Sequence, residues 1–148
     1  MKIYGDGGGR ESLQQQITEL GLNENCILEH SVSDIAVKFQ ESSIFVLSSR
    51  YEGFGLVIVE AMSCGLPVVS FACHCGPRDI ITEETDGFLV PEGDIDGLAE
   101  KINLLIEEDH FRKNMGKMAR LKAENYKMEK VGVQWTALFE SLLKPERK

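Results

Sequence analysis

The chain has 148 residues, the usual size of one domain, and its 43% hydrophobic and 27% charged residues are typical of a globular protein. Its net charge of −8 argues against nucleic acid as a partner. No apolar run reaches the roughly 18 residues of a spanning helix, and the first residues do not resemble a secretory signal. We therefore expect a cytoplasmic protein whose four cysteines are reduced.

The first third of the chain alternates predicted strands and helices. A strand at residues 2–4 runs into a glycine-rich turn at residues 5–9, and apolar residues then recur at helical spacing over residues 10–20. A second strand is predicted at residues 26–28. A short helix should follow, with Ser33 and Asp34 as candidate N-caps. The continuous apolar run at residues 44–47 predicts a strand that is covered on both faces.

The same alternation continues to residue 90. A Gly-Phe-Gly turn at residues 53–55 leads into a helix at residues 56–64, and strands are predicted at residues 67–71 and 87–90 with a helical turn at 76–81 between them. Three helices should follow, beginning near residues 94, 110 and 129, the first capped by Asp94. This order predicts an α/β fold: a doubly wound, Rossmann-like parallel sheet with helices on both faces and a C-terminal helical tail.

Two glutamates, Glu52 and Glu60, flank the Gly-Phe-Gly turn. The helix at residues 56–64 is apolar almost throughout, so we expect Glu60 to be buried, where a carboxylate without a partner is costly. The alternatives are a surface glutamate at position 60 and an ordinary loop charge at position 52.

The start of this helix is a candidate anion site. It follows the carboxyl end of a predicted parallel strand, the edge at which open α/β sheets bind ligands. Backbone N–H groups and the helix dipole favour an anion there, and Gly53 and Gly55 permit close approach. Carboxylates on either side can accept hydrogen bonds from sugar hydroxyls. A nucleotide-sugar, whose diphosphate joins two sugars, fits this order of groups.

With these motifs, the sequence resembles the C-terminal lobe of retaining glycosyltransferases of family 4, which have the two-lobed GT-B fold. The matching segments are residues 4–7, 48–55, 60–62, 65–69 and 85–91. The resemblance implies that residues 1–148 are a nucleotide-sugar-binding domain. It also implies that the N-terminal acceptor lobe, the first strand and helix of this lobe, and the cationic diphosphate clamp lie outside the chain, so that the fragment alone is inactive.

The resemblance also implies roles for individual residues. Glu52 is expected beside the donor sugar as the catalytic residue, and Glu60 on the nucleotide ribose. The backbone of Gly53, Phe54, Gly55 and Leu56 is expected to meet the donor sugar and the diphosphate. The loop from His30 to Asp34 is expected to hold the nucleobase largely through main chain, with Val32, Ser33 and Asp34 as contact residues. Gly5 and Gly7 are expected near the nucleotide.

The whole enzyme is then expected to transfer a sugar from a nucleoside-diphosphate sugar to a glycan or lipid-linked acceptor with retention. The resemblance implies a role in polysaccharide biosynthesis, in the cytoplasm or at the inner membrane face, and no metal or other cofactor. Residues 73–81 resemble a variant found in enzymes that build surface polysaccharides, which favours a UDP-sugar. The alternatives are a non-catalytic nucleotide-binding module or half of a split enzyme. An epimerase of this fold would need an acid–base cluster that is not evident.

Other polar residues have plainer interpretations. The glycines at residues 5–9 either contact phosphate or only permit a tight turn. The spacing of Cys73 and Cys75 is a poor match to structural zinc sites, so no metal is expected there. His30 and His110 lie in no motif and are expected to be ordinary positions. The basic residues from 112 to 122 are expected to form a solvated face rather than a lipid-binding patch.

Overall fold

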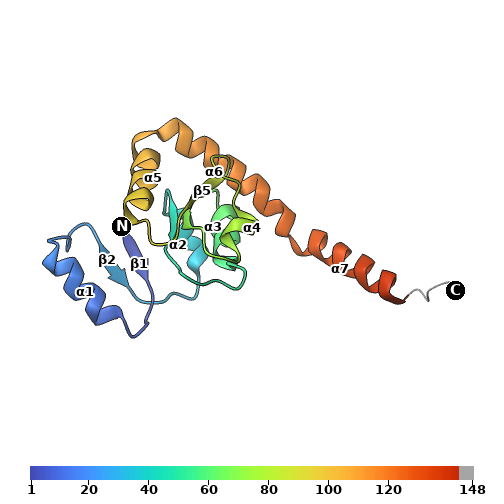
Figure 1. Ribbon diagram of the computed structural model, residues 1–148, viewed down its shortest axis with the longest axis horizontal. Helices are drawn as coiled ribbons and strands as arrows, with labels where there is room; N and C mark the ends of the chain where they lie inside the picture. The colour runs from blue at the N-terminus through green and yellow to red at the C-terminus, as the bar shows by residue number, and fades with distance from the viewer. Residues whose placement is uncertain (144–148) are drawn as a thin grey trace. The chain divides into compact units, whose positions relative to one another are not determined.

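The computed structural model describes residues 1–143, and the chain divides into two compact units, Met1–Ile35 and Ala36–Lys148 (Figure 1). In the first unit, β1 (Lys2–Tyr4) pairs in parallel with β2 (Ile27–Glu29), and α1 (Arg10–Glu19) connects them. The small core of this unit includes Ile17 and Cys26.

The second unit is built on a three-stranded parallel sheet. Its strands are β3 (Phe45–Leu47), β4 (Val68–Phe71) and β5 (Gly87–Val90), paired in that order. The helix α3 (Leu56–Ser63) connects β3 to β4, and α4 (Pro77–Ile80) connects β4 to β5. The short helix α2 (Ile35–Gln40) precedes β3 and packs Phe39 edge-on against Phe45.

The side chains of β4 alternate between the two faces of the sheet, so both faces are apolar and helices cover both. On one face, Val68 belongs to a buried cluster with Ile58 and Met62 of α3. On the other face, Val69 belongs to a second cluster with Leu105 of α5 (Ile95–Glu107). The central strand β4 is buried along its whole length, as expected for a parallel strand with both faces covered, whereas the residues of β3 are partly buried.

The C-terminal part of the chain is helical. The Asp94 side chain accepts a hydrogen bond from the Gly97 amide at 2.9 Å and so caps α5, as predicted. The helix α6 (Asp109–Ala123) contributes Met115 and Ala119 to the two clusters. It continues through the 3₁₀ turn η1 (Glu124–Tyr126) into α7 (Met128–Leu143), which has no buried residue (Figure 1).

The structure confirms the predicted α/β class, the parallel pairing, the covering helices and the C-terminal helices. The strands within residues 1–143 pair as two parallel sheets, one in each unit, where the sequence predicted one. The difference arises because an apolar run identifies a strand but not its partner. Among the described residues, no helix has both the length and the apolar character that crossing a bilayer requires.

Candidate functional site

The turn before α3 has a backbone that depends on glycine. Gly55 is the N-cap residue of α3 and has φ +85° and ψ 45°, in the left-handed region that glycine enters without a side-chain penalty. No side chain caps this end of the helix. The Ile58 N–H donates to the Gly55 carbonyl oxygen at 2.9 Å, so the Leu56 and Val57 N–H groups are the ones left for an anion at this end.

A second glycine holds this turn from outside. Gly76 precedes α4 with φ +84°, and a Cβ at this position would overlap the carbonyl oxygen of Phe54. The Gly76 amide donates to the Asp79 carboxylate at 3.1 Å, which fixes the start of α4. On its side-chain side, Phe54 packs edge-on against Tyr126 of η1, with ring centroids 5.9 Å apart. The Gly-Phe-Gly turn is therefore braced by both α4 and η1.

Glu52 is half-buried beside a pocket. The pocket has a volume of about 190 Å³, and its other lining residues are Arg50, Tyr51, His74 and Cys75. Within residues 1–143, the Glu52 carboxylate makes no hydrogen bond or ion pair. Burial, and then the charge of Glu52, raises the pKa of the Cys73 thiol. A carboxylate without a partner at a pocket can accept hydrogen bonds from a polyhydroxylated ligand.

His74 and Cys75, next to the buried Cys73, line one side of this pocket. Cys73 is 1% exposed, whereas Cys75 is open to solvent. Across the part of the chain that the structure describes, no three His, Cys, Asp or Glu side chains gather to hold a metal ion. The segment of residues 73–75 therefore lies beside Glu52 at the candidate site.

The expectation that Glu60 is buried is wrong. The buried face of α3 consists of Ile58, Ala61 and Met62, at helical spacing. Glu60 lies outside this face, in line with Leu56 four residues earlier, and both side chains are exposed. The apolar composition of the helix concealed this exposed stripe. Glu60 therefore bears no burial cost and is accessible to a ligand, although it does not line the pocket that contains Glu52.

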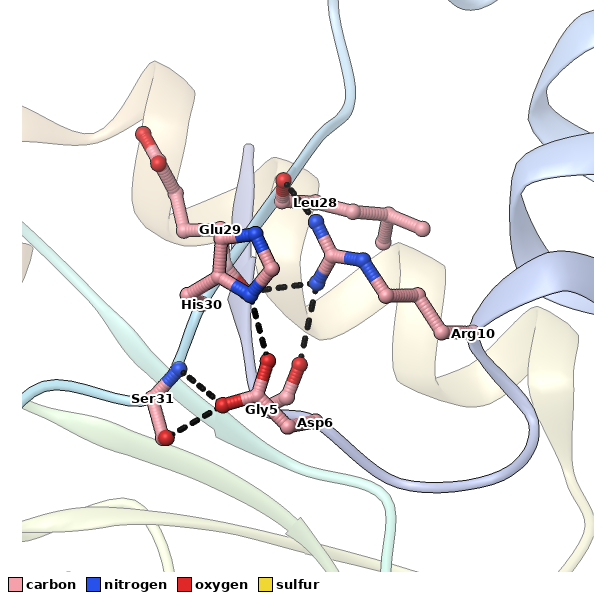
Figure 2. Close-up of polar contacts among 7 residues, drawn as sticks. All are labelled: Gly5, Asp6, Arg10, Leu28, Glu29, His30 and Ser31. Atoms are coloured by element: carbon pink, nitrogen blue, oxygen red, sulfur yellow. Dashed lines mark hydrogen bonds and ion pairs between the residues drawn. The ribbon is translucent and has the colours of Figure 1, made fainter.

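The other predicted residues belong to the first unit, where Asp6 joins the glycine-rich turn to the segment that follows β2 (Figure 2). One Asp6 oxygen lies 2.5 Å from His30 Nδ1. The other accepts hydrogen bonds from the Ser31 amide at 3.0 Å and from the Ser31 hydroxyl. The bonds from Ser31, and then the one from His30, hold the pKa of Asp6 well below its usual range.

Arg10 braces the same region from behind. Its guanidinium donates to the carbonyl oxygens of Gly5, Leu28 and Glu29 at 2.8–3.0 Å (Figure 2). These contacts tie the carboxyl ends of β1 and β2 together.

The residues that sequence reasoning expected here are reachable from solvent. Val32, Ser33 and Asp34 are all exposed, and Gly5 and Gly7 line a second pocket of about 200 Å³. Asp6 and Ser31 lie within the segments that the sequence predicted, but their side-chain contacts, and any role for Arg10, were not predicted. The only signal was the polar residue inside the glycine turn, because contacts across 24 or 25 positions leave no local pattern.

Comparison with known proteins agrees with this architecture. Residues 1–122 match the family model for glycosyl transferases group 1, and the chain therefore belongs to that family. It is 30% identical over 138 residues to an uncharacterized glycosyltransferase of Haemophilus influenzae. It is 31% identical over 140 residues to a poly(ribitol-phosphate) alpha-N-acetylglucosaminyltransferase of Staphylococcus aureus.

Two solved structures share the fold closely. Anabaena HepE in complex with UDP superposes with a TM-score of 0.84 at 31% identity, over 96% of this chain and 40% of that one. A variant of S. aureus TarM in complex with UDP and alpha-GlcNAc-glycerol superposes with a TM-score of 0.87 at 31% identity, over 93% of this chain and 28% of that one. The matches with the H. influenzae and S. aureus relatives cover 93% and 94% of this chain but only 39% and 28% of theirs.

Proposed function

We propose that this chain is the donor-nucleotide-binding lobe of a retaining glycosyltransferase of family 4. The complete enzyme would transfer a sugar from a nucleoside-diphosphate sugar to a glycan or lipid-linked acceptor, in polysaccharide biosynthesis. The observation that carries this proposal is the turn before α3. Its helix end has no side-chain cap, Gly55 gives it a left-handed backbone, and an unpaired Glu52 lies just before it.

The chemistry follows from this geometry. Glu52 would bind hydroxyls of the donor sugar in its pocket, and the exposed Glu60 would bind those of the nucleotide ribose. The backbone of residues 53–56 would hold the diphosphate and stabilise the charge that develops on it as it leaves. Because fixed N–H donors can do this, we propose a reaction without a metal.

The remaining assignments follow the same likeness. The nucleoside would lie against Val32, Ser33 and Asp34, near Gly5 and Gly7. UDP is our preferred nucleotide because similar proteins of known structure are described in complex with UDP. An acceptor-binding lobe outside this chain would complete the enzyme, at work in the cytoplasm or at the inner membrane face.

Titration calorimetry of the chain with UDP, GDP and ADP tests the proposal. We expect weak binding, strongest for UDP, and about tenfold or greater loss of affinity in Glu60→Ala, because a hydrogen bond to a charged group contributes roughly 1.5–3 kcal/mol. Glu100→Ala is the matched control, since Glu100 is an exposed helical glutamate outside the site. Undiminished affinity in Glu60→Ala would remove the ribose assignment, and no binding of any nucleotide would refute the proposed function.

A further inference from the structure

The contact between Asp6 and His30 defines the hydrogen-bonding state of the imidazole (Figure 2). His30 Nδ1 lies 2.5 Å from an Asp6 oxygen. An ionised carboxylate only accepts hydrogen bonds, so Nδ1 must carry the proton. In a neutral imidazole the other nitrogen, Nε2, then has no proton and is an acceptor.

The His30 side chain lies at the surface rather than in the core. It is 80% exposed, and Asp6 is its hydrogen-bond partner within residues 1–143. An exposed imidazole that is held at one nitrogen keeps a single orientation without being buried. The Nε2 side of the ring is therefore fixed in direction and accessible to solvent.

The same carboxylate fixes the backbone that follows His30. The second Asp6 oxygen accepts from both the amide and the hydroxyl of Ser31. Arg10 holds the carbonyl oxygens of Gly5 and Glu29, the residues just before Asp6 and His30. The backbone next to both Asp6 and His30 is thus held by hydrogen bonds.

We propose that Asp6 is a positioning residue for nucleotide recognition: it fixes the Nδ1–H tautomer of His30 and so presents Nε2 as an acceptor to an N–H group of the nucleobase. This inference rests on the proposed function, because the nucleoside is assigned to the segment that His30 begins. It adds a specificity-determining side chain to a loop that was expected to hold the nucleobase largely through main chain, with the His30 side chain in an ordinary position.

The variant Asp6→Asn tests the tautomer directly. The Ser31 amide can only donate, so the asparagine oxygen would stay on Ser31 and its NH2 group would face Nδ1. His30 would then change to the Nε2–H form, which donates where the wild type accepts. The ¹⁵N chemical shifts of the His30 ring distinguish the two tautomers, and a merely structural role for Asp6 would not invert them. A wild-type His30 in the Nε2–H form would overturn the proposal.

Calorimetry with UDP tests the consequence for binding. We expect Asp6→Asn and His30→Ala each to weaken UDP about 3- to 10-fold, as for one lost hydrogen bond. The double variant should lose little more than His30→Ala, because Asp6 acts through His30. Glu11→Gln and His110→Ala are matched controls that change an exposed charge or imidazole elsewhere, and we expect them to bind within twofold of the wild type.

The outcomes separate this inference from the proposed function. If the wild type binds UDP and His30→Ala binds it equally well, the role of His30 is refuted while the donor lobe assignment stands. If the wild type binds no nucleotide, the proposed function fails and this inference fails with it. His30→Ala keeps the test valid even if Asp6→Asn does not fold, because the exposed imidazole contributes nothing to the core.

Discussion

Replacing Gly76 by alanine should destabilise the second unit and loosen the turn before α3. The φ of +84° alone costs an L-residue roughly 1–2 kcal/mol. The added Cβ would also overlap the Phe54 carbonyl, which belongs to backbone that can yield only by moving the turn. Overpacking of this kind typically costs about 1–3 kcal/mol. We therefore expect a total loss of about 2–5 kcal/mol in urea unfolding followed by circular dichroism.

Gly93→Ala is the matched control for this variant. Gly93 has φ +83°, almost the value of Gly76, but a Cβ there would have no atom within 4 Å. It should therefore show only the backbone cost of about 1–2 kcal/mol. The excess loss in Gly76→Ala then measures the contact with Phe54 together with the cost of the Gly76 ψ of −82°. Equal losses in Gly76→Ala and Gly93→Ala would show that Gly76 does not brace the turn.

Three further predictions concern ionisable groups. Lys122→Met should lower the free energy of unfolding by about 2 kcal/mol more than Asp86→Asn. Lys122→Met leaves the buried Asp86 carboxylate without its cation, whereas in Asp86→Asn the partly exposed Lys122 ammonium group can reach water. Equal losses in the two variants would contradict this. Iodoacetamide should alkylate the exposed Cys75 faster than the buried Cys73, whose thiol pKa is raised. A saturating UDP-sugar should slow the reaction at Cys75, and unchanged labelling of Cys75 would place the sugar elsewhere. The folded pKa of Asp6 is lowered, so its contribution to stability is complete above the unfolded pKa of about 3.9 and is lost as the pH falls through the folded pKa. The unfolding free energies of wild type and Asp6→Asn should therefore differ by a constant amount above about pH 5 and converge below about pH 4. A constant difference at all pH values would refute this.

Local sequence patterns predicted the helices and strands well because each depends on neighbouring residues. Gly55 begins α3 and Gly65 follows its end, both with positive φ angles. Asp94 caps α5 by accepting from an amide three residues away. Such signals lie within one turn of chain. The division of the strands into two sheets depends on partners far apart in the sequence, which periodicity does not encode.

The same distinction separates the predicted from the missed features of the candidate site. The uncapped start of α3 follows from the Gly-Phe-Gly turn itself. Gly76 and Tyr126, which brace that turn, lie 22 and 72 positions beyond their contact residue Phe54, and the sequence analysis did not anticipate them. Glu60 was misjudged for a related reason: mean apolarity measures the whole helix, but burial depends on which face meets the sheet.

The corrected position of Glu60 changes the physical basis of its proposed role. A buried carboxylate would have required a partner to offset its desolvation, and that requirement was the first argument for a ligand. An exposed carboxylate has no such requirement, so its role must rest on accessibility and on its place near the uncapped helix end. Asp6 presents the complementary case. It is also exposed, but three hydrogen bonds to two residues fix it in place, so it is suited to positioning other groups, whereas Glu60 is suited to contact with a ligand. Comparing Asp6→Asn with Glu60→Ala in one set of UDP titrations therefore separates a residue that positions another side chain from one that contacts the ligand.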